Sequence, residues 1–213
     1  KLLFIPILIF SVIVHECAHG IAALRAGDPT AKMMGRITLN PVPHIDLFGS
    51  VIIPAFLLLS GSPILFGYAK PVPVNPRYFR NPRRDEITVS FAGPAANLIL
   101  SFLFLILAVI LVPLARTLHF STALIQLLLD VLNSGILINL VLAFFNLIPI
   151  PPLDGSHILE NVLPPRYAQY FAMIRPYGFF ILILLFVTPL LDVIYIPVKI
   201  VYAIYVTILR IFI

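Results

Sequence analysis

Two histidines and a glutamate lie close together in the apolar stretch SVIVHECAHGIAAL, near the start of the chain. His15 and His19 are four residues apart, so a helix would place both imidazoles on one face. An ionised side chain at the centre of a bilayer costs roughly 2.5–3.5 kcal/mol on insertion scales, so a specific function must offset the cost of Glu16. This HExxH spacing is typical of helices that bind zinc through two imidazoles and keep the glutamate beside the metal as a base. We therefore predict that His15 and His19 bind one zinc ion and that Glu16 is the catalytic base.

A catalytic zinc ion takes a third protein ligand and keeps one position open. The later motif NLIPIPPLDGSHIL supplies Asp154, after three prolines that interrupt the helix ending near Asn146. Unwound backbone is tolerated at membrane depth only where protein or a polar cavity surrounds it, so we predict Asp154 as the third ligand. Alternatively, Asp154 only caps the next helix. His44 is the reserve ligand, whereas we expect His157 in the outer shell or at the surface and His119 at the far surface.

The composition indicates that these residues lie in a membrane. Of the 213 residues, 61% are hydrophobic and 11% are charged, whereas soluble domains carry about 25% charged residues. The net charge of +5 does not indicate nucleic acid as a partner, because the basic residues stand beside apolar segments. We predict an all-α polytopic membrane protein with one transmembrane domain over 1–213, comprising a catalytic core at about 1–160 and accessory helices at about 176–213.

Five apolar stretches are long enough to cross about 30 Å of hydrocarbon as helices. They cover about 2–24, 87–114, 121–148, 176–194 and 195–213. A sixth apolar stretch, 47–66, contains two glycines and two prolines, which fit a straight membrane helix poorly.

The position of 47–66 decides whether the metal ligands can meet. If this stretch crossed the membrane fully, His19 and Asp154 would fall on opposite sides, whereas a re-entrant hairpin keeps them on the same side. The hairpin also gathers most of the 14 lysines and arginines on the side of His19. We therefore predict five transmembrane helices plus a re-entrant hairpin, with the zinc toward the cytoplasmic side.

Short β-strands are predicted in the polar connections on either side of this hairpin. In GRITLNP, Ile37 and Leu39 alternate with polar residues and a proline follows, which predicts a strand over 36–40. The proline-rich segment AKPVPVNP is predicted to be extended at a sheet edge. An unwound substrate could add its backbone to the free edge of 36–40.

Three motifs together resemble the site-2 protease family of intramembrane zinc metalloproteases. They are HExxH in a membrane helix, FAGPAANLIL opening a later helix and NLIPIPPLDG closing another, in the order of that family. The connecting segments resemble the compact prokaryotic branch without a PDZ domain. The resemblance implies zinc held by His15, His19 and Asp154, with Glu16 as the base and Asn146 near the substrate carbonyl. It also implies that Gly93, Pro94 and Asn97 pack around the site.

These features predict a zinc-dependent endopeptidase that cleaves transmembrane segments of membrane proteins, with one zinc ion per chain, in a prokaryotic cell membrane. We expect Asn146, Asn97, Asn40 and His44 around the site, as an oxyanion donor or in the second shell. Two alternatives stay open, namely a metal-ion transporter and a catalytically silent zinc-binding membrane protein. The partners implied are a transmembrane substrate and the lipid bilayer, and the sequence does not reveal the oligomeric state.

Overall fold

The computed structural model describes residues 4–53, 56, 59–60 and 69–212. The regular structure of these residues is helical, and they contain no strand. The elements in chain order are α1 (Phe4–Ala26), α2 (Thr30–Met33), η1 (Val42–His44), η2 (Leu47–Ile52), η3 (Pro76–Tyr78), α4 (Pro82–Thr117), α5 (Thr122–Asn146), α6 (Asp154–Val162), α7 (Pro165–Ile174), η4 (Arg175–Tyr177), α8 (Gly178–Val187), α9 (Leu190–Ile194) and α10 (Ile196–Phe212). The η elements are 3₁₀ turns, except for η2, which is a short π-helix.

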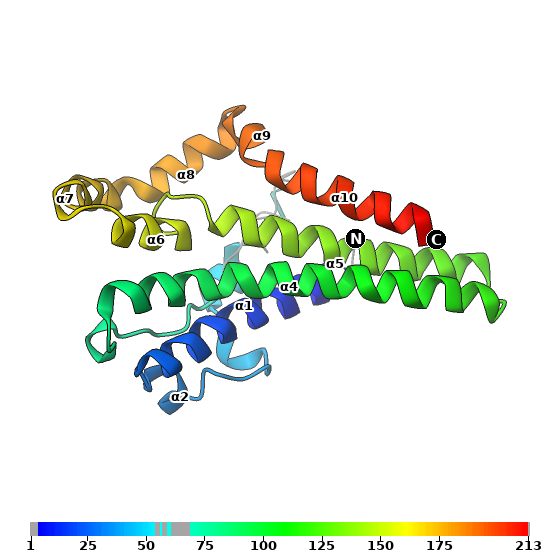
Figure 1. Cartoon of the computed structure of the whole chain (residues 1–213), viewed down its shortest axis with the longest axis horizontal. Coiled ribbons are helices and arrows are strands. Elements are labelled where there is room, and N and C mark those ends of the chain that lie inside the picture. The colour runs from blue at the N-terminus through cyan, green and yellow to red at the C-terminus, as the bar shows by residue number, and fades with distance from the viewer. Residues whose placement is uncertain (1–3, 54–55, 57–58, 61–68, 213) are drawn as a thin grey trace.

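The long helices α4 and α5 run antiparallel, with α1 packed against one end of the pair and α10 against the other (Figure 1). The 36 residues of α4 extend about 54 Å at 1.5 Å per residue, more than the hydrocarbon core of a bilayer. Leu105 of α4, Ile136 and Leu140 of α5 and Val198 of α10 form a buried cluster. Away from such contacts these helices expose apolar side chains, as expected of helices that face lipid.

The end of α1 and the start of α4 lie together at one end of the molecule. The backbone N–H of Arg80 donates to the carbonyl oxygen of Ala26 at 3.2 Å. The carboxylate of Asp28, which follows α1, accepts hydrogen bonds from the backbone N–H of Asn75 at 2.7 Å and from that of Thr30 at 2.9 Å. The chain between these two helices therefore begins and ends at the same end of the molecule.

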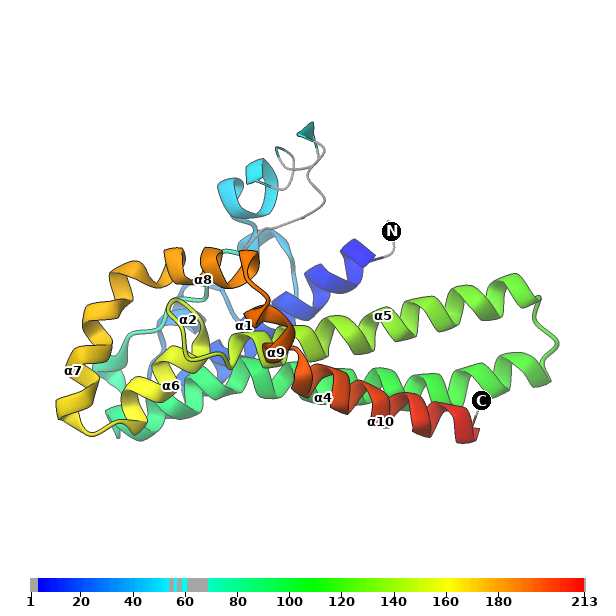
Figure 2. The same ribbon diagram turned by 90° about the horizontal axis from the view of Figure 1, so that it is seen from above.

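Half of the predicted re-entrant hairpin over 47–66, namely 54–55, 57–58 and 61–66, lies outside the described residues. Its described beginning, η2, starts after Asp46, whose carboxylate accepts a hydrogen bond from the backbone N–H of Gly49 at 2.7 Å. Figure 2 shows η2 projecting away from the helix bundle.

The prediction of β-strands is not confirmed, because residues 36–40 form a series of bends and 69–75 lack regular structure. Side chains take the backbone groups that a ladder would use. The guanidinium of Arg36 donates to the carbonyl oxygens of Lys70 and Pro71. The carbonyl oxygen of Thr38 is contacted by Cys17 Sγ at 3.0 Å and by Nε2 of His44 at 2.9 Å. The prolines in PVP also have no N–H to donate.

The predicted count of five transmembrane helices is not confirmed either. Four helical segments of the described chain are long and apolar enough to cross a membrane, namely 4–26, 82–117, 122–146 and 165–186. The first three agree with the prediction, while the fourth starts earlier and combines α7 with most of α8. Both views show α8 and α10 following one another along the length of α4 rather than crossing back (Figures 1 and 2). The apolar pattern gives the extent of these helices but contains no signal for their relative direction.

Candidate metal centre

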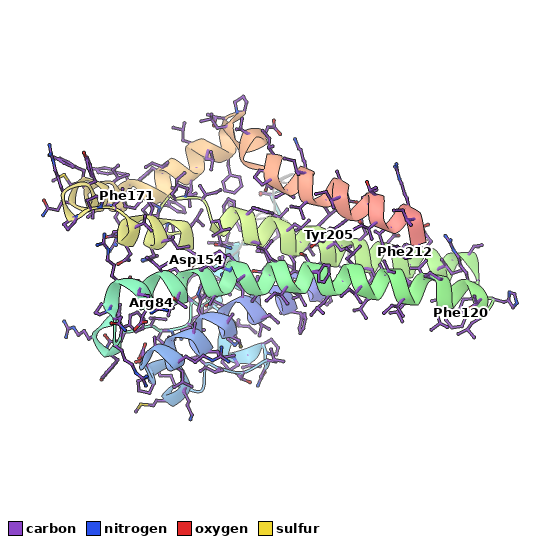
Figure 3. All side chains as sticks on the ribbon, viewed as in Figure 1. Arg84, Phe120, Asp154, Phe171, Tyr205 and Phe212 are labelled. Carbon is purple, nitrogen blue, oxygen red and sulfur yellow. The ribbon has the colours of Figure 1, made fainter. Side chains whose placement is uncertain are left out.

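Two helices and one loop bring His15, His19 and Asp154 together. The histidines stand on one face of α1, and Asp154 is the first residue of α6, directly after the proline-containing loop 147–153. Figure 3 shows Asp154 between α6 and the long helix α4. The two Nε2 atoms lie 3.0 Å apart, and Oδ2 of Asp154 lies 3.2 Å from that of His15 and 3.4 Å from that of His19. Within the described chain these are the one group of three such ligands close enough to share an ion.

This triangle has the dimensions of a zinc site. In a tetrahedral site with metal–ligand distances near 2.0–2.1 Å, neighbouring ligand atoms lie about 3.3–3.4 Å apart. Asp154 Oδ2 is buried and has no hydrogen-bond partner, as expected of a carboxylate oxygen that binds a metal ion. A proton could satisfy one pair of these three atoms, whereas a divalent cation satisfies all three.

The opposite nitrogen of each imidazole already has a partner. Nδ1 of His15 lies 2.6 Å from Oδ1 of Asn97, and Nδ1 of His19 lies 2.7 Å from the carbonyl oxygen of Val89. Both partners accept, so each Nδ1 carries the proton and each Nε2 presents a lone pair toward the centre of the triangle. This is the usual outer-shell arrangement of histidines that bind zinc.

The carboxyl of Asp154 is ionised at neutral pH, as a ligand must be. Burial raises the pKa of Asp154, but hydrogen bonds from His15 and His19, when these imidazoles carry hydrogen on Nε2, lower it by more, to about 2. The loop before Asp154 is fixed by α8: Leu182 and Leu185 pack on Ile148 and Leu153. The accessory helix α8, whose role the sequence left open, therefore supports the segment that presents this ligand.

α4 approaches the histidines at Gly93. A Cβ atom at this position would lie 2.4 Å from Nε2 of His19 and 2.6 Å from Nε2 of His15. Real Cβ atoms do not make contacts under 3.0 Å, so the absence of a side chain at Gly93 leaves room for the metal centre. The role expected for this glycine, packing around the site, agrees with its position.

Glu16 lies beside the histidines with one oxygen engaged. Its Oε2 accepts a hydrogen bond from the backbone N–H of Val72 at 2.7 Å. Because both neighbours of Val72 are prolines, this is the one N–H that residues 71–73 can offer, and it is directed at the carboxylate. The sequence did not reveal this contact, although an isolated N–H between two prolines is the signal that could have indicated it.

A cavity of about 400 Å³ opens beside these groups. It is lined by the three ligands, by Glu16 and by Asn146, whose Nδ2 donates to the carbonyl oxygen of Leu142 at 2.9 Å. His157 also lines it, with Nδ1 3.6 Å from the carboxylate of Glu86.

Other predicted residues lie elsewhere. Asn40 is exposed, and its Oδ1 accepts from the backbone N–H of Val42 at 3.1 Å in a local turn. His44 is buried, but its Nε2 contacts the carbonyl oxygen of Thr38 and it does not line the cavity. His119 is in the turn between α4 and α5, with a positive φ of 56°.

The chain was compared with known proteins. It matches the family model described as Peptidase family M50 over residues 3–129 and 114–185. It is 44% identical over 185 residues to "Putative zinc metalloprotease YwhC" of Bacillus subtilis, which covers 86% of this chain and 79% of that protein.

More distant relatives carry a similar name. The chain is 32% identical over 184 residues to "Putative zinc metalloprotease Rip2" of Mycolicibacterium smegmatis, and this match covers 86% of this chain and 66% of that protein. It is 31% identical over 183 residues to the protein of that name from Mycobacterium tuberculosis, and this match covers 85% of this chain and 65% of that protein. The chain therefore spans about two thirds of the length of these two relatives. No solved structure matches it. The matches confirm the resemblance read from the three motifs, and the chain belongs to peptidase family M50, the family of site-2 proteases and other zinc metalloproteases.

Proposed function

We propose that this protein is a zinc-dependent intramembrane endopeptidase that cleaves transmembrane segments of other membrane proteins. The observation that carries the proposal is the triangle of His15, His19 and Asp154 beside Glu16, in a cavity among apolar helices. The family membership supports a zinc metalloprotease. The four apolar helices support a reaction at membrane depth.

His15, His19 and Asp154 would hold the zinc, and the imidazole atoms that face this position are the two Nε2 nitrogens. When bound, zinc supplies Lewis acidity toward the scissile carbonyl and toward water. Glu16 is the general base: the N–H of Val72 holds Oε2, which leaves Oε1 to take a proton from the attacking water. The same carboxyl then delivers that proton to the nitrogen of the departing amine as the C–N bond breaks.

Asn146 is the candidate donor to the developing oxyanion. One hydrogen of its amide nitrogen is bound to the carbonyl oxygen of Leu142. The second hydrogen of this nitrogen can be offered to a substrate in the cavity that Asn146 lines. Asn97 acts further out, because its contact is with the Nδ1 atom of His15 rather than with the cavity.

The catalytic side faces the cytoplasm in this proposal. Four arginines, at 77, 80, 83 and 84, surround the start of α4, the end that also carries the metal site. Basic residues gather on the cytoplasmic side of membrane proteins. Single cysteines at the exposed Met33 and Arg77, in a Cys17→Ala background, should be protected from an impermeant reagent in intact cells, and one at Phe120 in the α4–α5 turn should react. Labelling at Met33 and Arg77 with protection at Phe120 would exclude this orientation.

The catalytic proposal is tested with Glu16→Gln and Asp154→Ala. Glu16→Gln should abolish cleavage of a model transmembrane helix and keep zinc at one ion per chain, because the base is not a ligand. Asp154→Ala should lose both zinc and cleavage. Glu160→Gln is the matched control, because Glu160 lies on α6 outside the cavity and pairs with Arg175, and it should retain both. Full activity of Glu16→Gln would contradict the assignment of the base.

A further inference from the structure

Three completely buried polar side chains connect the three central helices behind the metal centre. Ser11 comes from α1, Asn97 from α4 and Asn139 from α5, and the relative exposure of each is 0%. An unpaired amide in such surroundings costs several kcal/mol. Their hydrogen bonds to one another are therefore expected to be complete and directional.

The orientation of Asn139 is fixed by its own helix. Its Nδ2 donates to the carbonyl oxygen of Gly135 at 2.8 Å and to the hydroxyl of Ser11 at 2.9 Å. A carbonyl oxygen can only accept, so the nitrogen must face Gly135 and the oxygen must face away. Oδ1 of Asn139 is thereby presented to α4 as an acceptor.

The orientation of Asn97 follows from that of Asn139. Nδ2 of Asn97 donates to Oδ1 of Asn139 at 2.8 Å and to the carbonyl oxygen of Ser11 at 3.2 Å. The bond to Asn139 is the shorter of the two. With both hydrogens directed at these acceptors, Oδ1 of Asn97 faces His15 and can only accept from Nδ1 at 2.6 Å.

We propose that Asn139 is a positioning residue for the metal centre: acting through Asn97, it keeps His15 in the tautomer with hydrogen on Nδ1 and directs the lone pair of Nε2 toward the zinc. The carbonyl oxygens of Gly135 and Ser11 fix the orientation of the two amides, because a carbonyl oxygen can only accept a hydrogen bond. If the amide of Asn97 turned over, its nitrogen would face Nδ1 of His15, and the tautomer with hydrogen on Nε2 would be favoured. That tautomer has no lone pair for zinc.

The proposal rests on His15 being a zinc ligand, as proposed above. Its test is Asn139→Leu, which has a similar size and removes the acceptor for Asn97. The matched control is Asn133→Leu on the same helix, because Asn133 also hydrogen-bonds to another helix, accepting from the hydroxyl of Tyr202 at 2.8 Å, but has no link to Asn97. Asn139→Ser is the second variant, since its hydroxyl can return to the carbonyl of Gly135 but is too short to reach Asn97.

Two measurements are made on each full-length variant. The first is the zinc dissociation constant, which should rise about tenfold in Asn139→Leu and in Asn139→Ser, at the low end of the range for loss of outer-shell partners. The second is the ¹⁵N spectrum of labelled histidine in protein from which metal has been removed by chelation, with the His15 signals assigned by their loss in His15→Ala. The protonated and unprotonated ring nitrogens have distinct shifts, so wild type should show hydrogen on Nδ1 and the Asn139 variants a mixture.

These outcomes separate the two proposals. If the Asn139 variants match Asn133→Leu in zinc affinity and keep a single His15 tautomer, the positioning role is wrong whether or not the protein is a protease. If His15→Ala binds zinc as tightly as wild type, the metal centre itself is wrong. If Asn139→Leu does not fold, Asn139→Ser decides by the same two measurements.

Discussion

Gly93 is the position at which one added methyl group would disturb the metal centre most directly. In Gly93→Ala the new Cβ atom would lie 2.4 Å from Nε2 of His19 and 2.6 Å from Nε2 of His15, whereas ordinary contacts begin at 3.4 Å. The shortfall at His19 is therefore 1.0 Å, the difference between 3.4 and 2.4 Å. Metal sites tolerate deviations of about 0.2 Å in ligand distances, so the required movement exceeds that tolerance about fivefold.

The imidazoles cannot simply rotate out of the way. Nδ1 of His15 is held by Asn97 and Nδ1 of His19 by the carbonyl oxygen of Val89. Gly93→Ala should therefore lose zinc and cleavage together. The helix itself should be retained, because alanine favours a helix over glycine by about 1 kcal/mol. Zinc per chain is measured by elemental analysis, cleavage with a model transmembrane helix, and helix content by circular dichroism.

A control must separate loss of the metal from general overpacking of α4. Ala108 lies on α4 far from Gly93, is 2% exposed, and packs with Val112 of the same helix and Leu132 of α5. Ala108→Val should destabilise the fold by roughly 1–3 kcal/mol, as overpacking does, and should keep one zinc per chain. A Gly93→Ala protein with full zinc and normal cleavage would refute the reasoning, because the metal could then not lie where His15 and His19 converge.

Three further predictions concern groups that hold the site in place. Val72→Pro removes the N–H that holds Glu16. Because a hydrogen bond to a charged group is worth about 1.5–3 kcal/mol, kcat should fall roughly 10- to 100-fold while the zinc content stays unchanged. Val72→Ala keeps the N–H and should lose little activity. Gly178→Ala would place a Cβ 2.2 Å from the carbonyl oxygen of Pro151, so it should displace the loop that presents the carboxylate ligand and lower zinc affinity, as measured by competition with a chelator. Burial raises the pKa of Asp28, but hydrogen bonds from backbone and hydroxyl donors lower it by more, below the ordinary 3.8. The stabilisation that the ionised Asp28 gives the fold is therefore complete above pH 3.8 and is lost as the pH falls through the lowered pKa of the native state. The Tm advantage of wild type over Asp28→Asn should vanish in acid and persist at neutral pH.

Much of the candidate metal centre could be predicted from the sequence because it follows from local geometry. The spacing of His15 and His19 fixes their common face once α1 is helical, and the prolines before Asp154 force the chain to leave a helix where a ligand is needed. The three long apolar stretches gave α1, α4 and α5 because hydrocarbon thickness sets their length. These inferences required no knowledge of how distant segments pack.

The remaining features depend on how distant segments pack, so the sequence pattern either predicted the wrong structure or gave no prediction. Alternation over 36–40 predicted a strand, but the carbonyl oxygen of Thr38 is contacted by the side chains of Cys17 and His44. The neighbouring segment 70–73 has two carbonyl oxygens bound by Arg36 and is depleted of N–H groups by proline. The same contacts explain why His44 faces away from the cavity. Asn139 was not among the predicted site residues, although a polar residue within a membrane helix is the signal that could have indicated it.

The membrane setting explains how a few neutral hydrogen bonds could control a metal centre. Interhelical hydrogen bonds in membranes average only about 0.6 kcal/mol, so the bonds among Ser11, Asn97 and Asn139 are expected to add little to stability. Their effect on orientation is larger, because no water is present in such surroundings to replace a partner when an amide turns over. The surroundings thus make the direction of each bond costly to reverse while leaving its net strength small. For this reason the Asn139 variants should lower zinc affinity by more than their modest change in Tm would suggest, whereas Asn133→Leu should change Tm alone.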